Sequence, residues 1–114
     1  MVKVAAAQIP VTKNTEKNLN KIIKYIKKAS SKKADIVCFP ESSLIHSKNK
    51  NSIKKIPIKK YINVIKKECK KNKIYCIFGT NILKNNRLYN SAFFIDSKGK
   101  IVYRYNKVNL FRNE

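Results

Sequence analysis

The sequence is poor in acidic residues, in cysteine and in histidine. Asp and Glu together number six, against 27 Lys and Arg, and the chain has three cysteines and one histidine. An odd number of cysteines without a Cys-x-x-Cys pair argues against a disulfide framework and against a zinc site. The single histidine excludes a multi-His metal cluster within the chain. We therefore expect neither a metal nor a cofactor.

Long apolar runs are also missing. No run approaches the roughly 20 residues that a membrane-spanning helix requires. Pro10 interrupts the apolar start of the chain before it reaches the length of a secretory signal. The 114 residues are enough for one small domain. We expect a soluble, cytoplasmic protein without a membrane partner.

Arginine is scarce, and this affects how the charge is interpreted. The formal net charge of +21 taken alone indicates nucleic acid or an anionic surface as a partner. Only three of the 27 cations are Arg, which is the residue best suited to bidentate recognition of phosphate and guanine. Lys, Asn and Ile supply nearly half of the chain and share A/T-rich codons. Genome composition is the favoured explanation, and a non-catalytic basic module that binds nucleic acid is the alternative.

The hydrophobic pattern predicts an α/β fold. A stripe of apolar residues from Leu19 to Ala29 recurs with the period of a helix. Short apolar runs bounded by turn residues predict strands, and Asp96–Gly99 has the composition of a hairpin turn. Residues 42–56 are polar and are expected to be irregular. The expected elements are strands at 2–9, 34–40, 73–80, 88–96 and 100–107, and helices at 15–31 and from Pro57 through Cys69.

Strands that alternate with helices indicate a partly parallel sheet, and the last two strands add an antiparallel hairpin. The predicted fold is therefore a mixed sheet with helices on one face. The sequence stops soon after the last strand, so the sheet is expected to be incomplete as it stands, with an exposed edge.

Glu41 is one of only six acidic residues, and it directly follows an apolar segment. It follows the apolar run 34–39 and Pro40, which has no N–H and therefore ends a sheet ladder. Ligands of open α/β sheets bind at the carboxyl ends of strands. A partly desolvated carboxylate at such a strand end is suited to proton transfer. The alternative is a helix cap or a salt bridge to one of the many lysines.

Lys107 is the second unusual residue. Most lysines occur in runs with Asn or other Lys, but Lys107 ends an aromatic segment and is in phase with Ile101, Tyr103 and Tyr105. If the strand continues this far, all four side chains share one face. An inward-facing cation needs a partner or a function. The alternative is a lysine whose stem covers the aromatic rings while its ammonium group reaches water.

Four segments resemble the carbon–nitrogen hydrolases of the nitrilase superfamily in sequence and in order. They are VAAAQIPVTKNTEKNLNKI, ADIVCFPES, IFGTNI and LYNSAFFIDSKGKIVYRYNKVNLF. The resemblance implies the amino-terminal part of an α-β-β-α sandwich, so that residues 1–114 form an incomplete catalytic domain. It also implies a small-molecule amide or nitrile substrate, and family members are often homo-oligomers.

The family uses a Glu-Lys-Cys triad. By resemblance, Glu41 is the general base and Lys107 stabilises the oxyanion, while Glu114 is a possible second acid. The family's nucleophilic cysteine lies downstream of the lysine, and the present chain stops seven residues after Lys107. Cys38, Cys69 and Cys76 are expected to be buried structural thiols instead. The nucleophile is therefore absent, and the chain is either a fragment of a hydrolase or half of a split enzyme that needs a complementary chain.

Overall fold

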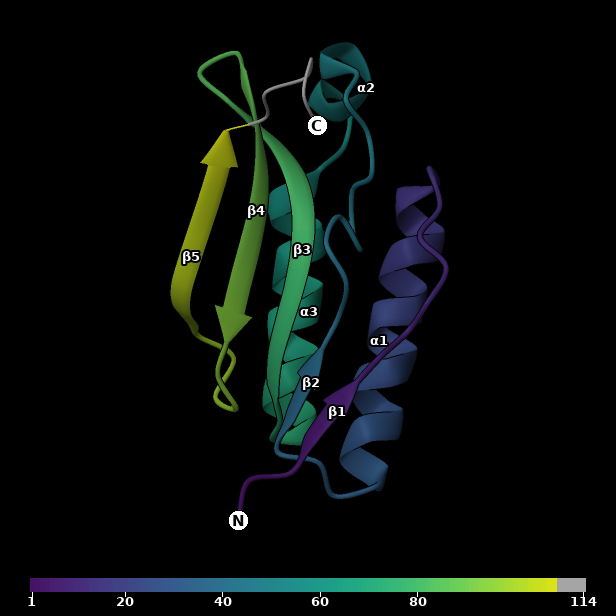
Figure 1. Ribbon diagram of the computed structural model, residues 1–114, viewed down its shortest axis with the longest axis vertical. Helices are drawn as coiled ribbons and strands as arrows, with labels where there is room; N and C mark the ends of the chain where they lie inside the picture. The colour runs from purple at the N-terminus through teal and green to yellow at the C-terminus, as the bar shows by residue number, and fades with distance from the viewer. Residues whose placement is uncertain (109–114) are drawn as a thin grey trace.

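The strands of the sheet lie side by side in the order in which they occur along the chain. The computed structural model describes residues 1–108. Strands β1, β2 and β3 are parallel, whereas β3–β4 and β4–β5 are antiparallel pairs (Figure 1). The predicted mixed sheet is thereby confirmed. In chain order the elements are β1 (Val4–Ala6), α1 (Thr15–Ser31), β2 (Ile36–Cys38), α2 (Lys50–Lys54), α3 (Ile58–Asn72), β3 (Tyr75–Lys84), β4 (Arg87–Ile95) and β5 (Ile101–Val108).

Helices α1 and α3 pack against each other and cover one face of the sheet, as expected (Figure 1). Helix α1 has the predicted bounds because the side chain of Asn14 accepts a hydrogen bond from the Lys17 amide and caps its first turn. Ile22 and Ile26 on its apolar stripe are fully buried. In α3 the corresponding stripe buries Ile65. Within residues 1–108, none of the helices has the length and apolar character needed to cross a membrane.

Residues 42–56 are not wholly irregular, which corrects the prediction. They contain the five-residue helix α2, which begins after Asn49 because the Asn49 side chain accepts a hydrogen bond from the Ser52 amide at 3.0 Å. Ile53 is the buried residue of this helix. One capped turn with a single apolar residue leaves no periodicity for a sequence pattern to detect.

Strand β3 extends to Lys84, past the end of the predicted strand 73–80. It pairs with β4 along its whole length, from Cys76 opposite Ile95 to Lys84 opposite Arg87. The turn that joins them consists of Asn85 and Asn86, both with positive φ (51° and 61°). Two such residues form the turn that matches the twist of a tight hairpin, and Asn tolerates this conformation.

A β-bulge interrupts the pairing of β4 with β5. Ile95 pairs with Ile101, but Phe94 pairs with Tyr103, so β5 carries one additional residue at this point. Ile101 therefore faces α3, whereas Tyr105 and Lys107 line a hollow on the opposite face. The expectation that Ile101 shares a face with Tyr103, Tyr105 and Lys107 is wrong, because the bulge reverses the alternation of side chains.

The face of the sheet opposite α1 and α3 carries aromatic side chains that are open to solvent. Tyr103 and Tyr105 are 63% and 54% exposed, and Tyr75 is 38% exposed. Tyr75 also contacts Phe94 across the sheet, with ring centroids 5.7 Å apart. We call this surface the open face. Contiguous exposed apolar side chains of this kind mark a contact surface.

Candidate functional site

Glu41 lies immediately beyond the carboxyl end of β2. The amide of Phe39 donates to the Ile77 carbonyl at 2.8 Å, and this is the last ladder bond before Pro40. Because Pro40 has no N–H, the chain leaves the sheet at this residue. Ser42 then adopts a left-handed conformation (φ 53°), which completes the turn. The turn places Glu41 over the neighbouring strand β3.

Gly79 of β3 lies directly beneath this turn. A Cβ atom on Gly79 would lie 2.8 Å from the Ser42 nitrogen and 2.9 Å from the Glu41 Cα. The Gly79 amide donates to the Ser43 hydroxyl oxygen, and that hydroxyl donates to the Gly79 carbonyl, both at 3.2 Å. Only glycine allows this close approach of two backbone segments. The Glu41 turn is thus seated on a strand in the middle of the sheet.

The segment after the turn continues this attachment along β3. The Leu44 amide donates to the Gly79 carbonyl at 3.0 Å, and the Ile45 amide donates to the Thr80 hydroxyl at 3.1 Å. The Asn81 amide donates to the Ile45 carbonyl at 2.9 Å. Leu44, Ile45 and Thr80 are fully buried. Buried hydrogen bonds and apolar packing together hold Glu41 from its carboxyl-terminal side.

Asn90 connects Glu41 to Lys107. The Asn90 side-chain amide donates to Glu41 Oε2 at 3.0 Å, although the two residues are 49 positions apart. On the next strand Lys107 is the direct cross-strand partner of Asn90. All three residues line one hollow of about 120 Å³ on the open face, together with Tyr105 and Gly79. The structure therefore brings together both site residues that the sequence singled out within 1–108.

The side chains of Glu41 and Lys107 are both exposed. The expectation that Glu41 is partly desolvated is thus wrong for this chain, because the open face has no covering layer among residues 1–108. Lys107 likewise does not face a closed interior.

The three cysteines lie away from this hollow. Cys69 and Cys76 are fully buried, as expected. The Cys76 thiol has a pKa well above its ordinary value, first through its hydrogen bond with Cys69 and then through burial. Cys38 is half-buried, which corrects the prediction of a buried thiol, and burial raises its pKa as well. A raised pKa keeps the thiols of Cys38 and Cys76 protonated, so neither has the thiolate character of a nucleophile, and Cys69 is buried away from the hollow.

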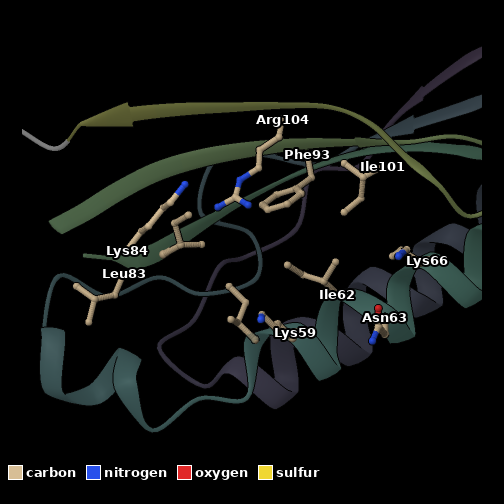
Figure 2. Close-up of a pocket in the computed structure, with 11 residues that line it drawn as sticks. Lys59, Ile62, Asn63, Lys66, Leu83, Lys84, Phe93, Ile101 and Arg104 are labelled. Atoms are coloured by element: carbon tan, nitrogen blue, oxygen red, sulfur yellow. The ribbon is translucent and has the colours of Figure 1, made fainter. Parts of the chain in front are cut away.

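A larger groove of about 520 Å³ lies on the other side of the sheet, between α3 and strands β3–β5. Figure 2 shows Ile62 and Lys59 of α3 on one wall and Arg104 beside Phe93 on the other. The Arg104 guanidinium lies 5.0 Å from the centre of the Phe93 ring. The groove contains neither Glu41 nor Lys107 and is separate from the candidate site.

Asn90 is the site residue that the interpretation of the sequence missed. Its signal was present in the segment Tyr-Asn-Ser-Ala, which carried the family resemblance without a role for the asparagine. Glu114, the possible second acid, lies outside the described residues.

Comparison with known proteins identifies the family of the chain. The model of the carbon–nitrogen hydrolase family matches residues 3–114. The deaminated glutathione amidase of Dictyostelium discoideum is 30% identical over 121 residues, covering 96% of this chain and 42% of that protein. The chain therefore belongs to the carbon–nitrogen hydrolase family, and it spans less than half the length of this relative.

Solved structures share the fold. An amidase from Nesterenkonia sp. superposes with a TM-score of 0.82 at 16% identity, over 96% of this chain and 44% of that one. A glutamine-dependent NAD+ synthetase from Acinetobacter baumannii superposes with a TM-score of 0.73 at 28% identity, over 96% of this chain and 21% of that one. The fold is thus that of nitrilase-superfamily amidases, as the sequence predicted.

Proposed function

We propose that the chain supplies two of the three catalytic groups of an amide hydrolase, with Glu41 as the general base and Lys107 as the stabiliser of the oxyanion. The supporting observation is that Glu41 and Lys107, on separate elements, line the same hollow at the carboxyl end of β2. The nucleophilic cysteine comes from outside this sequence. An amide substrate is favoured because two of the named relatives are amidases and the third is a glutamine-dependent synthetase.

The chemistry follows from these groups. The Glu41 carboxylate takes the proton of the cysteine thiol, and the sulfur attacks the amide carbon. Negative charge then develops on the amide oxygen, where the Lys107 ammonium stabilises it. The amine leaves with the proton held by Glu41, and a thioester remains. Glu41 next takes a proton from water, the hydroxide attacks the thioester, and the carboxylic acid and free thiol are released.

The remaining part of the domain covers the open face in this proposal. The exposed Tyr105 lines the hollow, and a layer packed on the open face would desolvate Glu41 and Lys107 and strengthen their electrostatic effect. That layer is either a later part of the same polypeptide or a complementary chain. The intact mass of the native polypeptide with this amino terminus distinguishes the two, because only the first gives a mass well above 13.2 kDa.

Hydrolysis of short aliphatic amides by the native polypeptide, or by the complex with its complementary chain, tests the proposal. Glu41→Gln and Lys107→Met each remove one charged group at nearly constant shape, and we expect each to lower kcat/KM by about 100-fold or more. Matched controls are Glu16→Gln and Lys98→Met, which lie on α1 and in the β4–β5 turn and leave the rate unchanged. An active enzyme whose rate is insensitive to both site variants would overturn the proposal.

A further inference from the structure

We propose that Asn90 is a positioning residue that holds the Glu41 carboxylate in one orientation beside Lys107. This inference rests on the proposed function, because it assigns Asn90 a task in the same site. Asn90 donates a hydrogen bond to one carboxylate oxygen of Glu41 and pairs across the sheet with Lys107. Asn90 therefore contacts the proposed base and lies directly opposite the proposed cation.

The backbone around Asn90 is well suited to this task. Asn90 lies on β4, which is paired on both sides, with Asn81 of β3 opposite it on one side and Lys107 of β5 on the other. A side chain on a strand in the interior of a sheet is placed more exactly than one on a loop. Glu41, by contrast, lies in a turn with an exposed side chain. The strand residue therefore orients the turn residue.

The neighbouring position strengthens the register of the two strands. Ser91 donates from its hydroxyl to the Asn106 side-chain oxygen at 2.6 Å, and Arg104 Nε donates to the same oxygen at 3.2 Å. The Ser91 bond ties β4 to β5, and the Arg104 bond within β5 holds the Asn106 side chain in place for it. A slip of one residue would turn Lys107 away from Asn90, so bonds that secure the register also secure the site.

An asparagine is chemically appropriate here because it can donate to a carboxylate without titrating. A hydrogen bond to the charged form of a carboxylate favours that form. The hydrogen bond from the Asn90 side chain to Oε2 also restricts rotation of the Glu41 carboxylate. The other oxygen, Oε1, is then left to accept the proton of the nucleophile. A lysine in place of Asn90 would form a direct ion pair and compete for the base. Asn90 holds Glu41 in one orientation while Lys107 is directed to the substrate oxygen.

The first experiment tests the contact in the 114-residue chain without catalysis. In a ¹⁵N-labelled sample we expect the Asn90 side-chain amide resonances to show a carboxylate partner and to shift in Glu41→Leu. Asn72 provides a matched control, because its side-chain amide donates to Glu68 Oε2 at 2.9 Å on α3. Glu41→Leu should move the Asn90 signals alone, and Glu68→Leu should move the Asn72 signals alone. If the chemical shifts of the Asn90 side-chain amide do not change in Glu41→Leu, the contact is refuted.

The second experiment tests the role in the active polypeptide or complex. Asn90→Leu removes the donor at similar size, and we expect kcat to fall about 10- to 100-fold, the loss expected for a hydrogen bond to a charged group. KM should change much less. Asn90→Asp places a second carboxylate beside Glu41, so the acid limb of the pH–rate profile should move to higher pH. A purely structural role would leave the position of that limb unchanged.

The two proposals can fail separately. A wild-type polypeptide that carries the cysteine and hydrolyses no amide would refute the proposed function, whatever the spectra show. An active wild type with an unchanged rate in Asn90→Leu and an unchanged pH profile in Asn90→Asp would refute the role of Asn90 alone.

Discussion

Gly79 and Glu41 approach so closely that a Cβ atom on Gly79 would lie 2.9 Å from the Glu41 Cα. The atoms around that position belong to the backbone of residues 40–42, which cannot swing aside as a flexible side chain can. The strand residue and the turn that carries the candidate base are therefore fitted to each other.

Gly79→Ala is accordingly expected to destabilise the chain and to displace Glu41. Overpacking of this kind costs about 1–3 kcal/mol in the free energy of unfolding, which urea denaturation measures. Gly99→Ala is the comparison, because a Cβ there would lie 2.7 Å from the Lys66 carbonyl oxygen, far from Glu41. Both variants should lose stability, but only Gly79→Ala should shift the Glu41 and Ser42 amide signals. An unchanged Glu41 environment in Gly79→Ala would contradict the close fit.

Ser43→Ala tests the second attachment of the turn. The buried hydroxyl both donates to and accepts from the backbone of Gly79. Its removal takes an acceptor from the buried Gly79 amide, whereas the Gly79 carbonyl keeps its hydrogen bond from the Leu44 amide. We expect a loss of about 1–3 kcal/mol in the free energy of unfolding. Ser31→Ala removes an exposed hydroxyl that bonds to the Lys28 carbonyl, and a surface change of this kind stays within about 0.5 kcal/mol. Equal effects in the two variants would show that the Ser43 bonds add no stability.

The cysteines should differ in reactivity toward an alkylating reagent. Cys38 is half-buried, whereas Cys69 and Cys76 are fully buried. In the native chain Cys38 should react first, and its rate should rise by about tenfold per pH unit through neutral pH, because burial raises its pKa and the thiolate is the reactive form. Cys69 and Cys76 should react only on unfolding. Mass spectrometry of the alkylated chain identifies the order in which the cysteines react. Modification of Cys76 before Cys38 would contradict the burial of Cys69 and Cys76.

Asp96 gives the stability of the β4–β5 hairpin a pH dependence. The backbone amide of Lys100 lowers the Asp96 pKa most, and the amide of Lys98 adds to this, each donating at 2.9 Å. A pKa that is lower in the folded chain contributes stability above the unfolded value of about 4, and this contribution is lost as the pH falls through the folded value. Asp96→Ala should therefore lower the urea midpoint at pH 7 and have a diminishing effect below about pH 4.

The control for this experiment is Asp96→Asn, which retains an acceptor oxygen but does not titrate. Between pH 7 and pH 3 the urea midpoint of Asp96→Asn should therefore fall less than that of the wild type. A difference between the wild type and Asp96→Ala that stays constant from pH 7 to pH 3 would contradict the role of the carboxylate.

Much of the helical layer could be predicted because local signals and packing agree there. Helix α1 has an N-cap at Asn14 and an apolar stripe whose members, such as Ile22 and Ile26, are buried. The end of β3 could not be predicted in the same way. The strand continues past Gly79 because β4 pairs with it, and that pairing depends on the conformation of Asn85 and Asn86 rather than on hydrophobic alternation.

The candidate site could be predicted in part. The position of Glu41 after a strand that Pro40 terminates follows from local chemistry. The partnership of Asn90 with Glu41 joins the turn after β2 to β4, two strands further along the chain, and no local pattern encodes it. The exposure of Glu41 depends on whether another layer covers the open face, which lies outside the information in these residues.

The bulge in β5 makes the chemistry of the site depend on a count of residues. Up to the bulge, Ile95 pairs with Ile101, and continuation of that register would set Asn90 opposite Asn106. The additional residue shifts the partner by one and brings Lys107 into line with Asn90. Deletion of Val102 would remove the bulge and leave the residues from Tyr103 onward with the same partners on β4, so Lys107 would stay opposite Asn90. Homologous chains in which the lysine lies one residue closer to the hairpin turn are thus expected to lack the bulge and to keep the lysine opposite the asparagine.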